Sequence, residues 1–395
     1  MQPLKVTIPG EYWDSRLYSG WLYLFHADGS FQTLDWKGLV EGLGRKTPSR
    51  NACTAYIAAF LDSSILYSRD NKVLVSDPEI KFVILKQFDR FSKTEFTVNS
   101  RRLLALTKNR QDSPFPFPHT DFEIYKGYLY VASKEGVATA GCRLQAKDPV
   151  IKRADKIFDA PSLALSALYS CLAIAAGEEG LFQLDLFETD AGLDGAADPL
   201  TPLSKMNCVG CNWNYWSIFG SSHIDDGYLA TFKKEAVFEM GKRNRALEEV
   251  VPARKIFGHS GYSWGVHDKI CQFRPDGIDV FRYAPWDEDE AKRLVRLGLI
   301  GLPPGLGGFV NAAVASFGVV MEFDKALVVL PSAGDPIVLD GEPVNWHVFP
   351  RSKFYENQLH VVYEDRLEIF SFNHDYFVDQ NTKLAGFRVT SRRMF

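Results

Sequence analysis

The chain has 395 residues, 46% of them hydrophobic and 13% aromatic, and a formal net charge of −4. This much apolar material can bury a large core, so the composition excludes a disordered chain. A charge this close to balance gives no reason to expect a general binder of nucleic acid or of anionic membranes.

One pattern recurs along the chain: an alternating apolar run, a short polar turn and a second alternating run. Alternation with period two around a turn of Gly or polar residues is typical of β-hairpins. The first copy is Trp21–Asp35. Later copies follow at Ile65–Val75, Tyr128–Ala138, Leu172–Leu186, Tyr228–Phe238, Ile270–Phe281, Val319–Val329 and Leu359–Phe370.

The spacing of these copies, about 40 to 55 residues, resembles that of β-propellers, in which each repeat is one small antiparallel sheet. The resemblance implies an all-β fold, with one closed propeller as a single domain over residues 1–395. We expect seven blades, with eight as the alternative. No WD40, kelch or other named blade signature occurs, so the resemblance carries no functional residues with it.

Most hairpins are preceded by a further strand-like segment, which we expect to be the innermost strand of its blade. Ala52–Phe60, Asn311–Ser316 and Val344–Phe349 occupy this position. Small residues dominate the first two, as expected where strands crowd around an axis. Lys81–Lys86 is the clearest candidate for an outer strand, and Arg102–Thr107 is a further strand candidate.

Three other segments extend this interpretation. Leu4–Ile8 is expected to form a strand that pairs with the last blade near Gly386–Thr390, because an open stack of sheets would leave an adhesive edge. Leu163–Ala176 is rich in the helix formers Ala and Leu, but its register with the other repeats favours strand. Trp36–Leu43 is expected to form a short helix.

Three insertions interrupt the pattern, at 109–119, 189–201 and 286–308. In 109–119 Pro alternates with Phe, which predicts an extended loop. The segment 189–201 is acidic and rich in Gly and Ala, which predicts a solvated surface loop. Trp286–Leu299 carries acids in its first turn and bases later, so we expect a short helical insertion there.

Cys208 and Cys211 are the only closely spaced cysteine pair among the six. Zinc requires four ligands, and neither a second pair nor suitably spaced histidines accompany these two. A redox pair is expected at a strand-to-helix junction, whereas strand-like residues follow here. We expect structural thiols, and neither a metal nor an organic cofactor.

The amino terminus lacks the apolar core of a signal peptide. No apolar stretch reaches the ~20 residues that a membrane helix needs. Six cysteines over this length do not form a disulfide framework. We therefore expect a cytoplasmic protein with reduced thiols and no membrane contact.

Basic residues gather modestly around one predicted hairpin tip. These possible phosphate contacts are Lys233, Lys234, Lys242, Arg243 and Arg245. Acidic residues such as Glu235 and Glu239 dilute them, so nucleic acid is a possible partner and not the favoured one.

Aromatic residues are the candidates for contacting a protein partner. Several tryptophans lie near the predicted first strands of their repeats or in an insertion, namely Trp213, Trp216, Trp264, Trp286 and Trp346. Large stiff side chains of this kind are enriched at interface hot spots. The competing interpretation is ordinary packing between blades.

Two classes of function fit these observations. The favoured hypothesis is a non-catalytic scaffold that docks a protein partner, either alone or as a subunit of a larger complex. The alternative is an enzyme, a hydrolase or lyase, with its site at the axial mouth. An enzyme should gather carboxylates, histidines or arginines from different blades, whereas a scaffold should show an apolar or aromatic patch.

Overall fold

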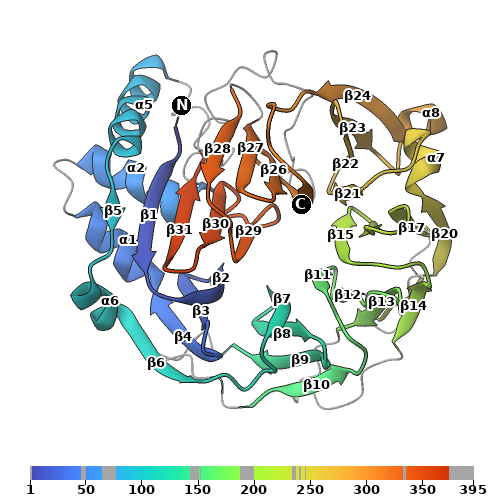
Figure 1. Cartoon of the computed structure of the whole chain (residues 1–395), viewed down its shortest axis with the longest axis horizontal. Helices are drawn as coiled ribbons and strands as arrows, with labels where there is room; N and C mark the ends of the chain where they lie inside the picture. The colour runs from blue at the N-terminus through green and yellow to red at the C-terminus, as the bar shows by residue number, and fades with distance from the viewer. Residues whose placement is uncertain are drawn as a thin grey trace. The chain divides into compact units, whose positions relative to one another are not determined.

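The protein is a seven-bladed β-propeller in this computed structural model (Figure 1). The structure describes residues 2–45, 50–64, 77–142, 151, 153–186, 200–233, 237–239, 242–244, 246–331 and 335–372. The chain divides into two compact units. Described residues before 114 and after 302 belong to the first unit, and those from 114 to 302 belong to the second.

The first unit holds three blades, each an antiparallel sheet whose strands follow one another in sequence except for the N-terminal strand. The first blade is β2 (Tyr12–Tyr18), β3 (Trp21–His26), β4 (Ser30–Asp35) and β6 (Thr107–Asp112). The sixth is β25 (Phe309–Ala315), β26 (Gly318–Phe323), β27 (Ala326–Pro331) and β28 (Ile337–Asp340). The seventh is β29 (Asn345–Val348), β30 (Gln358–Val362), β31 (Arg366–Ser371) and β1 (Leu4–Pro9), with the short β5 (Phe96–Thr97) beside β1.

The second unit holds four blades with the same consecutive order. The second blade is β7 (His119–Tyr125), β8 (Tyr128–Ser133), β9 (Gly136–Gly141) and β10 (Asp155–Phe158). The third is β11 (Ala164–Leu168), β12 (Cys171–Ala175), β13 (Leu181–Asp185) and β14 (Thr201–Ser204). The fourth is β15 (Gly210–Asn214), β16 (Ser217–Ser221), β17 (Tyr228–Phe232) and β20 (Leu247–Pro252), and the fifth is β21 (Ser263–Val266), β22 (Lys269–Arg274), β23 (Gly277–Tyr283) and β24 (Leu294–Ile300).

The repeated hairpins are the middle strands of the blades. Six predicted copies are confirmed as β3–β4, β8–β9, β12–β13, β22–β23, β26–β27 and β30–β31. Leu163–Ala176 contains strands, as expected. All five residues of β12 are buried, because strands in the middle of a blade have sheets on both faces. The copy at Ile65–Val75 lies outside the described residues.

One predicted hairpin is wrong. Tyr228–Phe238 is not a single β-hairpin, because β17 ends at Phe232 and pairs with β20. A two-stranded ribbon of β18 (Val237–Glu239) and β19 (Lys242–Asn244) comes between them in the chain. Sequence alternation continues through this insertion, which is why it resembles a continuous repeat.

The N-terminal strand completes the seventh blade, which is the last one, as predicted. β1 pairs antiparallel with β31, with Val6 opposite Ile369. The predicted partner segment, Gly386–Thr390, lies outside the described residues. β5 then pairs parallel with β1. The strand that pairs with β1 belongs to the last predicted hairpin, Leu359–Phe370.

Helices inserted between β4 and β6 cover the outside of this blade (Figure 1). They are α1 (Trp36–Gly44), α2 (Arg50–Phe60), α5 (Pro78–Ser92) and α6 (Ser100–Leu106). The short helix expected at Trp36–Leu43 is confirmed. None of the helices in the described ranges is long and apolar enough to cross a membrane.

Three strand predictions in this region are wrong. Ala52–Phe60 lies in α2, where Tyr56, Ala59 and Phe60 are buried with helical spacing. Lys81–Lys86 lies in α5, which begins at the N-cap Asp77. Arg102–Thr107 lies mostly in α6, and Asn99 caps that helix by accepting a hydrogen bond from the Arg102 N–H. Helix caps and burial at helical spacing outweigh the strand-like composition of these segments.

The predicted insertions also differ from the structure. Of the expected loop at 109–119, residues 109–112 belong to β6 and His119 begins β7. The expected helix at Trp286–Leu299 shrinks to α8 (Glu290–Arg293), because β24 begins at Leu294 and pairs with β23. Pairing at the blade edge thus outweighs the helical charge pattern. Most of 189–201 lies outside the described residues.

Buried polar side chains fasten α2 to the seventh blade. The carbonyl of Phe60 accepts hydrogen bonds from the Trp36 indole at 2.7 Å and from the Gln358 amide at 3.0 Å. The carbonyl of Ala59 accepts from Asn357 at 2.9 Å and from Ser371 at 2.8 Å. The last carbonyls of a helix lack intrahelical partners, so these contacts satisfy groups whose burial is otherwise costly.

Shortening one buried side chain of β1 tests the importance of this strand. Ile8 is fully buried, so we expect Ile8→Ala to lower the free energy of unfolding by about 2–5 kcal/mol, measured by urea denaturation. The control is Lys5→Ala, which removes a partly exposed pair with Glu368. We expect Lys5→Ala to cost less than about 1 kcal/mol. Equal effects of the two variants would contradict a core role for β1.

Candidate interaction surface

The first hairpin of every blade in the second unit closes with a two-residue turn. The turns are Lys126–Gly127, Tyr169–Ser170, Tyr215–Trp216 and His267–Asp268. In each, the residues that flank the turn pair directly. The innermost strands of these blades contact one another in sequence order, so the four turns succeed one another at the same end of the strands.

All four turns begin with a bulky residue in the left-handed backbone region. Lys126 has φ of 49°, and Tyr169, Tyr215 and His267, which carry rings, have φ of 54°, 52° and 52°. Tight hairpins of this kind favour Asn and Gly, because a side chain in this region costs roughly 1–2 kcal/mol per residue. Two-residue hairpin turns require positive φ, and three of these four turns place a ring at that position.

Hydrogen bonds join the turns of the second and third blades, and those of the fourth and fifth blades. The backbone N–H of Ser170 donates to the Tyr125 hydroxyl at 2.9 Å, and Lys126 Nζ donates to the Ser170 hydroxyl at 2.9 Å. The amide of Asn214 donates to the carbonyl of His267 at 3.0 Å. The turns therefore form a stiff, interconnected surface and not a set of independent loops.

Ring contacts extend this network. Tyr169 lies 5.1 Å from Trp216, measured between ring centroids. Tyr215 lies 4.7 Å from Trp286 in an edge-to-face arrangement. Such pairs contribute about 0.5–1.5 kcal/mol beyond their buried area. Two of the strained tyrosines thus support two tryptophans.

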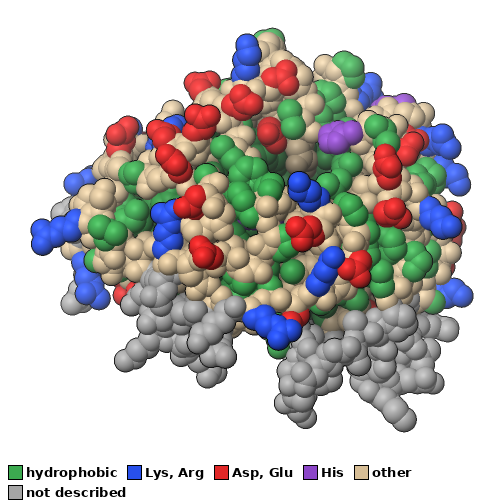
Figure 2. Space-filling view, turned by 60° about the horizontal axis from the view of Figure 1, so that its bottom comes forward, with side chains coloured by type: hydrophobic (Ala, Val, Ile, Leu, Met, Phe, Trp, Pro, Cys, Tyr) green, Lys and Arg blue, Asp and Glu red, His purple; other side chains and the backbone are tan. Residues whose placement is uncertain are grey.

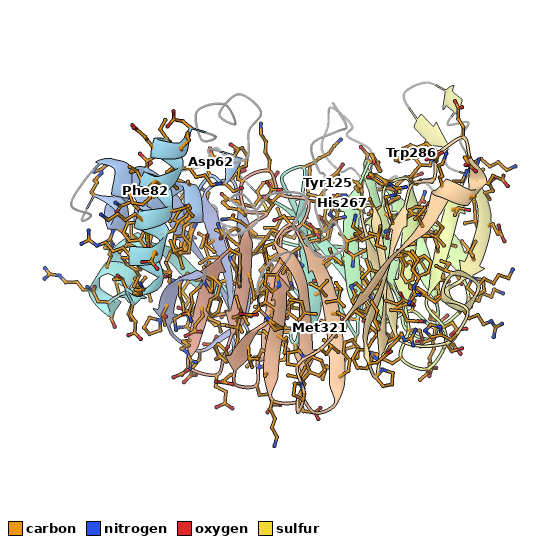
Figure 3. The ribbon with its side chains drawn as sticks, turned by 90° about the horizontal axis from the view of Figure 1, so that it is seen from above. Asp62, Phe82, Tyr125, His267, Trp286 and Met321 are labelled. Atoms are coloured by element: carbon orange, nitrogen blue, oxygen red, sulfur yellow. The ribbon has the colours of Figure 1, made fainter. Side chains whose placement is uncertain are left out.

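The loop that carries Trp286 is held by its own hydrogen bonds. The Ala284 N–H donates to the Arg293 carbonyl at 2.8 Å, and the Arg293 Nε donates to the Asp287 carbonyl at 3.0 Å. In Figure 3, Tyr125, His267 and Trp286 of the second unit lie towards the same end of its strands. Trp286 is 47% exposed although its loop is well anchored.

A groove of about 1000 Å³ opens between the fourth and fifth blades, beside these rings. Trp216 and Trp286 line it together with the apolar side chains of Leu229, Val251 and Ile256. We call this feature the tryptophan groove. A concave, mainly apolar cleft with a few polar groups at its rim is the usual form of a binding site.

Polar groups of the tryptophan groove lie at two depths. Tyr283 is buried, and its hydroxyl lies 2.6 Å from the Ser217 hydroxyl. Burial raises the pKa of Tyr283 to about 12, so its hydroxyl stays protonated at neutral pH. Lys233, Glu248 and Glu249 are exposed at the rim.

The structure places the five candidate tryptophans in two different environments. Trp213, Trp264 and Trp346 are buried, with 0%, 2% and 9% exposure. Trp213 donates to the Ser166 carbonyl at 2.9 Å, and so holds the third and fourth blades together. Only Trp216 and Trp286 of the five line the tryptophan groove.

The candidate basic residues are only partly described. Lys233 lies at the rim of the tryptophan groove. Lys234 and Arg245 lie outside the described residues, and only the backbone of β19, with Lys242 and Arg243, is described. Over the face drawn in Figure 2, Lys and Arg side chains are interspersed with Asp and Glu. A track for a phosphate backbone would require a one-sign surface.

Cys208 and Cys211 lie inside the core between the third and fourth blades. Cys208 Sγ contacts the Gly210 carbonyl at 3.3 Å, and Cys211 Sγ contacts the Ala164 carbonyl at 3.6 Å. Burial raises the pKa of Cys208 to about 12, which disfavours the thiolate. Over the described part of the chain, no group of three or more His, Cys, Asp and Glu is placed to hold a metal ion.

The first unit contains a polar cluster that superficially resembles a catalytic site. The Ser15 hydroxyl lies 3.0 Å from His360 Nδ1, and Asp14 Oδ1 lies 2.6 Å from His347 Nε2. Burial holds the pKa of His360 well below its ordinary value. Ser15, Asp14 and His360 are fully buried, so a substrate could reach them only if the inner strands separated. The cluster joins β2 to β29 and β30.

Sequence reasoning did not select Tyr169, Tyr215 or His267 as functional residues. The signal that finds them is their position between two directly paired strands, where a two-residue turn requires positive φ. Aromatic residues in place of Asn or Gly at that point are visible in the sequence once the ends of β11, β15 and β21 are known.

No protein-family model matches the chain, and no curated protein matches its sequence. Among solved structures, it is similar to the β-propeller domain of Cps50 (Swd1) from Myceliophteria thermophila, with 12% identity, a TM-score of 0.41 and coverage of 65% of this chain and 97% of that one. It is also similar to a chain of a mitotic checkpoint complex, with 10% identity, a TM-score of 0.41 and coverage of 62% of this chain and 71% of that one. The computationally designed Ika8 protein has 8% identity and a TM-score of 0.46, with coverage of 94% of this chain and 100% of that one. Likenesses this weak say nothing about function, and the blade count rests on the sheets themselves.

The backbone strain at Tyr215 leads to a prediction about stability. In Tyr215→Gly, the relief of roughly 1–2 kcal/mol of backbone strain offsets the lost ring pair of about 0.5–1.5 kcal/mol. We therefore expect the free energy of unfolding to change little. Trp213→Ala, in the core, should cost about 3–5 kcal/mol in the same urea titration. A loss in Tyr215→Gly as large as in Trp213→Ala would show that Tyr215 serves the fold.

Thiol reactivity tests the structural role of the cysteine pair. We expect iodoacetamide at pH 8 to leave Cys208 unmodified in the folded protein, because the raised pKa leaves almost no thiolate. Cys53 is the one partly exposed thiol of the six and should react first. Unfolding in urea is the control, and it should make both react. Rapid modification of Cys208 in the folded protein, followed by mass spectrometry, would contradict this environment.

Proposed function

We propose that the protein is a non-catalytic cytoplasmic scaffold that docks a protein partner, as a subunit of a larger complex, through the tryptophan groove. The observation that carries the proposal is the environment of Trp286. Its ring is nearly half exposed, yet Tyr215 and the hydrogen bonds of its loop fix its position beside an apolar cleft. A rigid aromatic residue at the edge of a pocket loses little entropy on binding and is typical of interface hot spots.

The compartment proposal is supported by the thiols. All six cysteines are free, and five of them are buried. Proteins of oxidising compartments usually convert such residues into disulfides, whereas cytoplasmic proteins keep them reduced.

The enzyme alternative has weaker support. It rests on the buried cluster of Asp14, Ser15, His347 and His360, which brings together the right residue types from two blades. A catalytic group must reach the reacting atoms of a substrate, and Ser15 is fully buried. The nucleic-acid alternative rests on Lys233 and on basic residues whose side chains are not described.

Truncation of Trp286 tests the proposal. Affinity purification of the native protein should recover a partner in stoichiometric amount, as measured by mass spectrometry. We expect Trp286→Ala and Trp216→Ala each to weaken binding of that purified partner at least tenfold in calorimetry, because hot-spot residues contribute about 2 kcal/mol or more.

The matched control is Phe354→Ala, an aromatic residue of the first unit with 45% exposure. We expect it to bind the partner like the unaltered protein. Thermal unfolding of all three variants checks that the fold is intact. Full binding by folded Trp286→Ala and Trp216→Ala would refute docking through the tryptophan groove, and turnover in a substrate screen without any partner would favour the enzyme.

A further inference from the structure

Resting on the proposed function, we propose that the tryptophan groove takes a peptide segment of the partner in which a Lys or Arg side chain flanks an apolar one. The apolar side chain would lie on the floor of the groove. The cation would lie between Trp286 and the two carboxylates of the rim, Glu248 and Glu249. Three features of the groove support this partner chemistry.

The first feature is a β-bulge in β20, at which two neighbouring acidic residues line the groove. Along the pairing of β17 with β20, Thr231 lies opposite Glu249 and Phe232 opposite Leu247, so Glu248 is the extra residue. Adjacent residues of a regular strand point to opposite faces, and a bulge re-aims side chains. Glu248 and Glu249 accordingly both line the groove.

The second feature is the balance of unpaired charge at the rim. Neither Glu248 nor Glu249 forms an ion pair with any residue that the structure describes. Of the two cations that line the groove, Arg293 is engaged by Glu290 at 3.3 Å. Among the described residues that line the groove, Lys233 is the one exposed cation outside an ion pair, and it accompanies the two carboxylates. This balance favours a cationic ligand over an acidic one.

The third feature is the aromatic lining. A cation over the face of an indole ring gains about 0.5–1 kcal/mol at exposed sites, and Trp is the best partner among the aromatic residues. Trp286, with 47% exposure, offers such a ring in the same groove that the carboxylates line. Burial is the main cause that raises the pKa of Tyr283; the hydrogen bond with Ser217 lowers that pKa, and the negative charge of Glu248 raises it.

The size of the groove favours a peptide over a small amine. Its volume of about 1000 Å³ is at the upper end of ligand pockets, which hold roughly 300–1000 Å³. A polyamine has no apolar side chain, so it would leave water in contact with the apolar floor of Leu229, Val251 and Ile256. A short segment with an apolar residue beside its cation fills both regions.

An array of immobilised heptapeptides tests this inference on the full chain. Each peptide has a central Leu flanked on both sides by Arg, Lys, Gln or Glu, within otherwise neutral positions. We expect Arg and Lys peptides to bind at least fivefold more protein than Gln peptides, and Glu peptides to bind least. Added salt should reduce the advantage of the cationic peptides, because exposed charges are screened. Equal binding of Arg and Gln peptides, preference for Glu, or no binding to any peptide would overturn the inference.

Variants separate this inference from the proposed function. Glu248→Gln with Glu249→Gln should abolish the preference for Arg over Gln while retaining binding of Leu-centred peptides. Glu178→Gln, on an exposed turn between β12 and β13, is the matched control and should keep the preference. If Trp286→Ala removes the partner but the double Glu variant changes nothing, the docking site stands and the charge assignment fails. Competition by spermidine at equal concentration would instead indicate a free polyamine as the ligand and overturn the peptide assignment.

Discussion

The pairing of β1 with β31 is the interaction on which the first unit depends. It joins the first described strand of the chain to the last one, and it supplies the seventh blade with its fourth strand. An outer strand left bare would present unpaired backbone groups to other chains. Here β5 and the inserted helices cover β1, and the apolar side chains of Leu4, Val6 and Ile8 lie in the same core as Tyr56 and Phe88. The first blade therefore contributes, through its long connection, to the stability of the last one.

The repeated hairpins were predictable because their residues obey one local rule. Alternation around a polar turn identifies Trp21–Asp35 or Val319–Val329 as strands without any tertiary information, and both proved to be hairpins. The helices were missed because small or apolar residues such as those of Ala52–Phe60 fit a strand equally well until their partners are known. The last carbonyls of α2 accept hydrogen bonds from the buried side chains of Gln358 and Asn357, which lie about 300 residues later in the sequence. Such contacts leave no local signal.

In the candidate site, too, some features could be predicted from the sequence and others depend on tertiary contacts. Sequence reasoning selected Trp213 and Trp216 together because both are large and close in the chain. The turn at Tyr215–Trp216 separates them: Trp213 lies before it, on a strand that packs against the third blade, and Trp216 lies at the tip beside Tyr169. Trp286 is the opposite case, since its predicted helix was mostly wrong, and the residue lies with 47% exposure in the segment before α8. Exposure of an aromatic residue depends on the turn that precedes it, and that turn is specified by backbone conformation more than by composition.

The same connection serves two purposes in different blades. The segment between the third and fourth strands carries the helices in the first blade, where it covers β1. In the fourth and fifth blades this segment carries the β18–β19 ribbon and the Trp286 loop, beside the groove. Insertions there leave the inner strands undisturbed, because the fourth strand lies on the outer side of each sheet. The inner hairpins of the second unit have no such freedom, since two-residue turns fix their length. They contribute to a surface only by exchanging Gly or Asn for a strained aromatic residue, as Tyr169 and Tyr215 do. Long outer loops can therefore shape the groove, while the strained inner turns hold its rings in place.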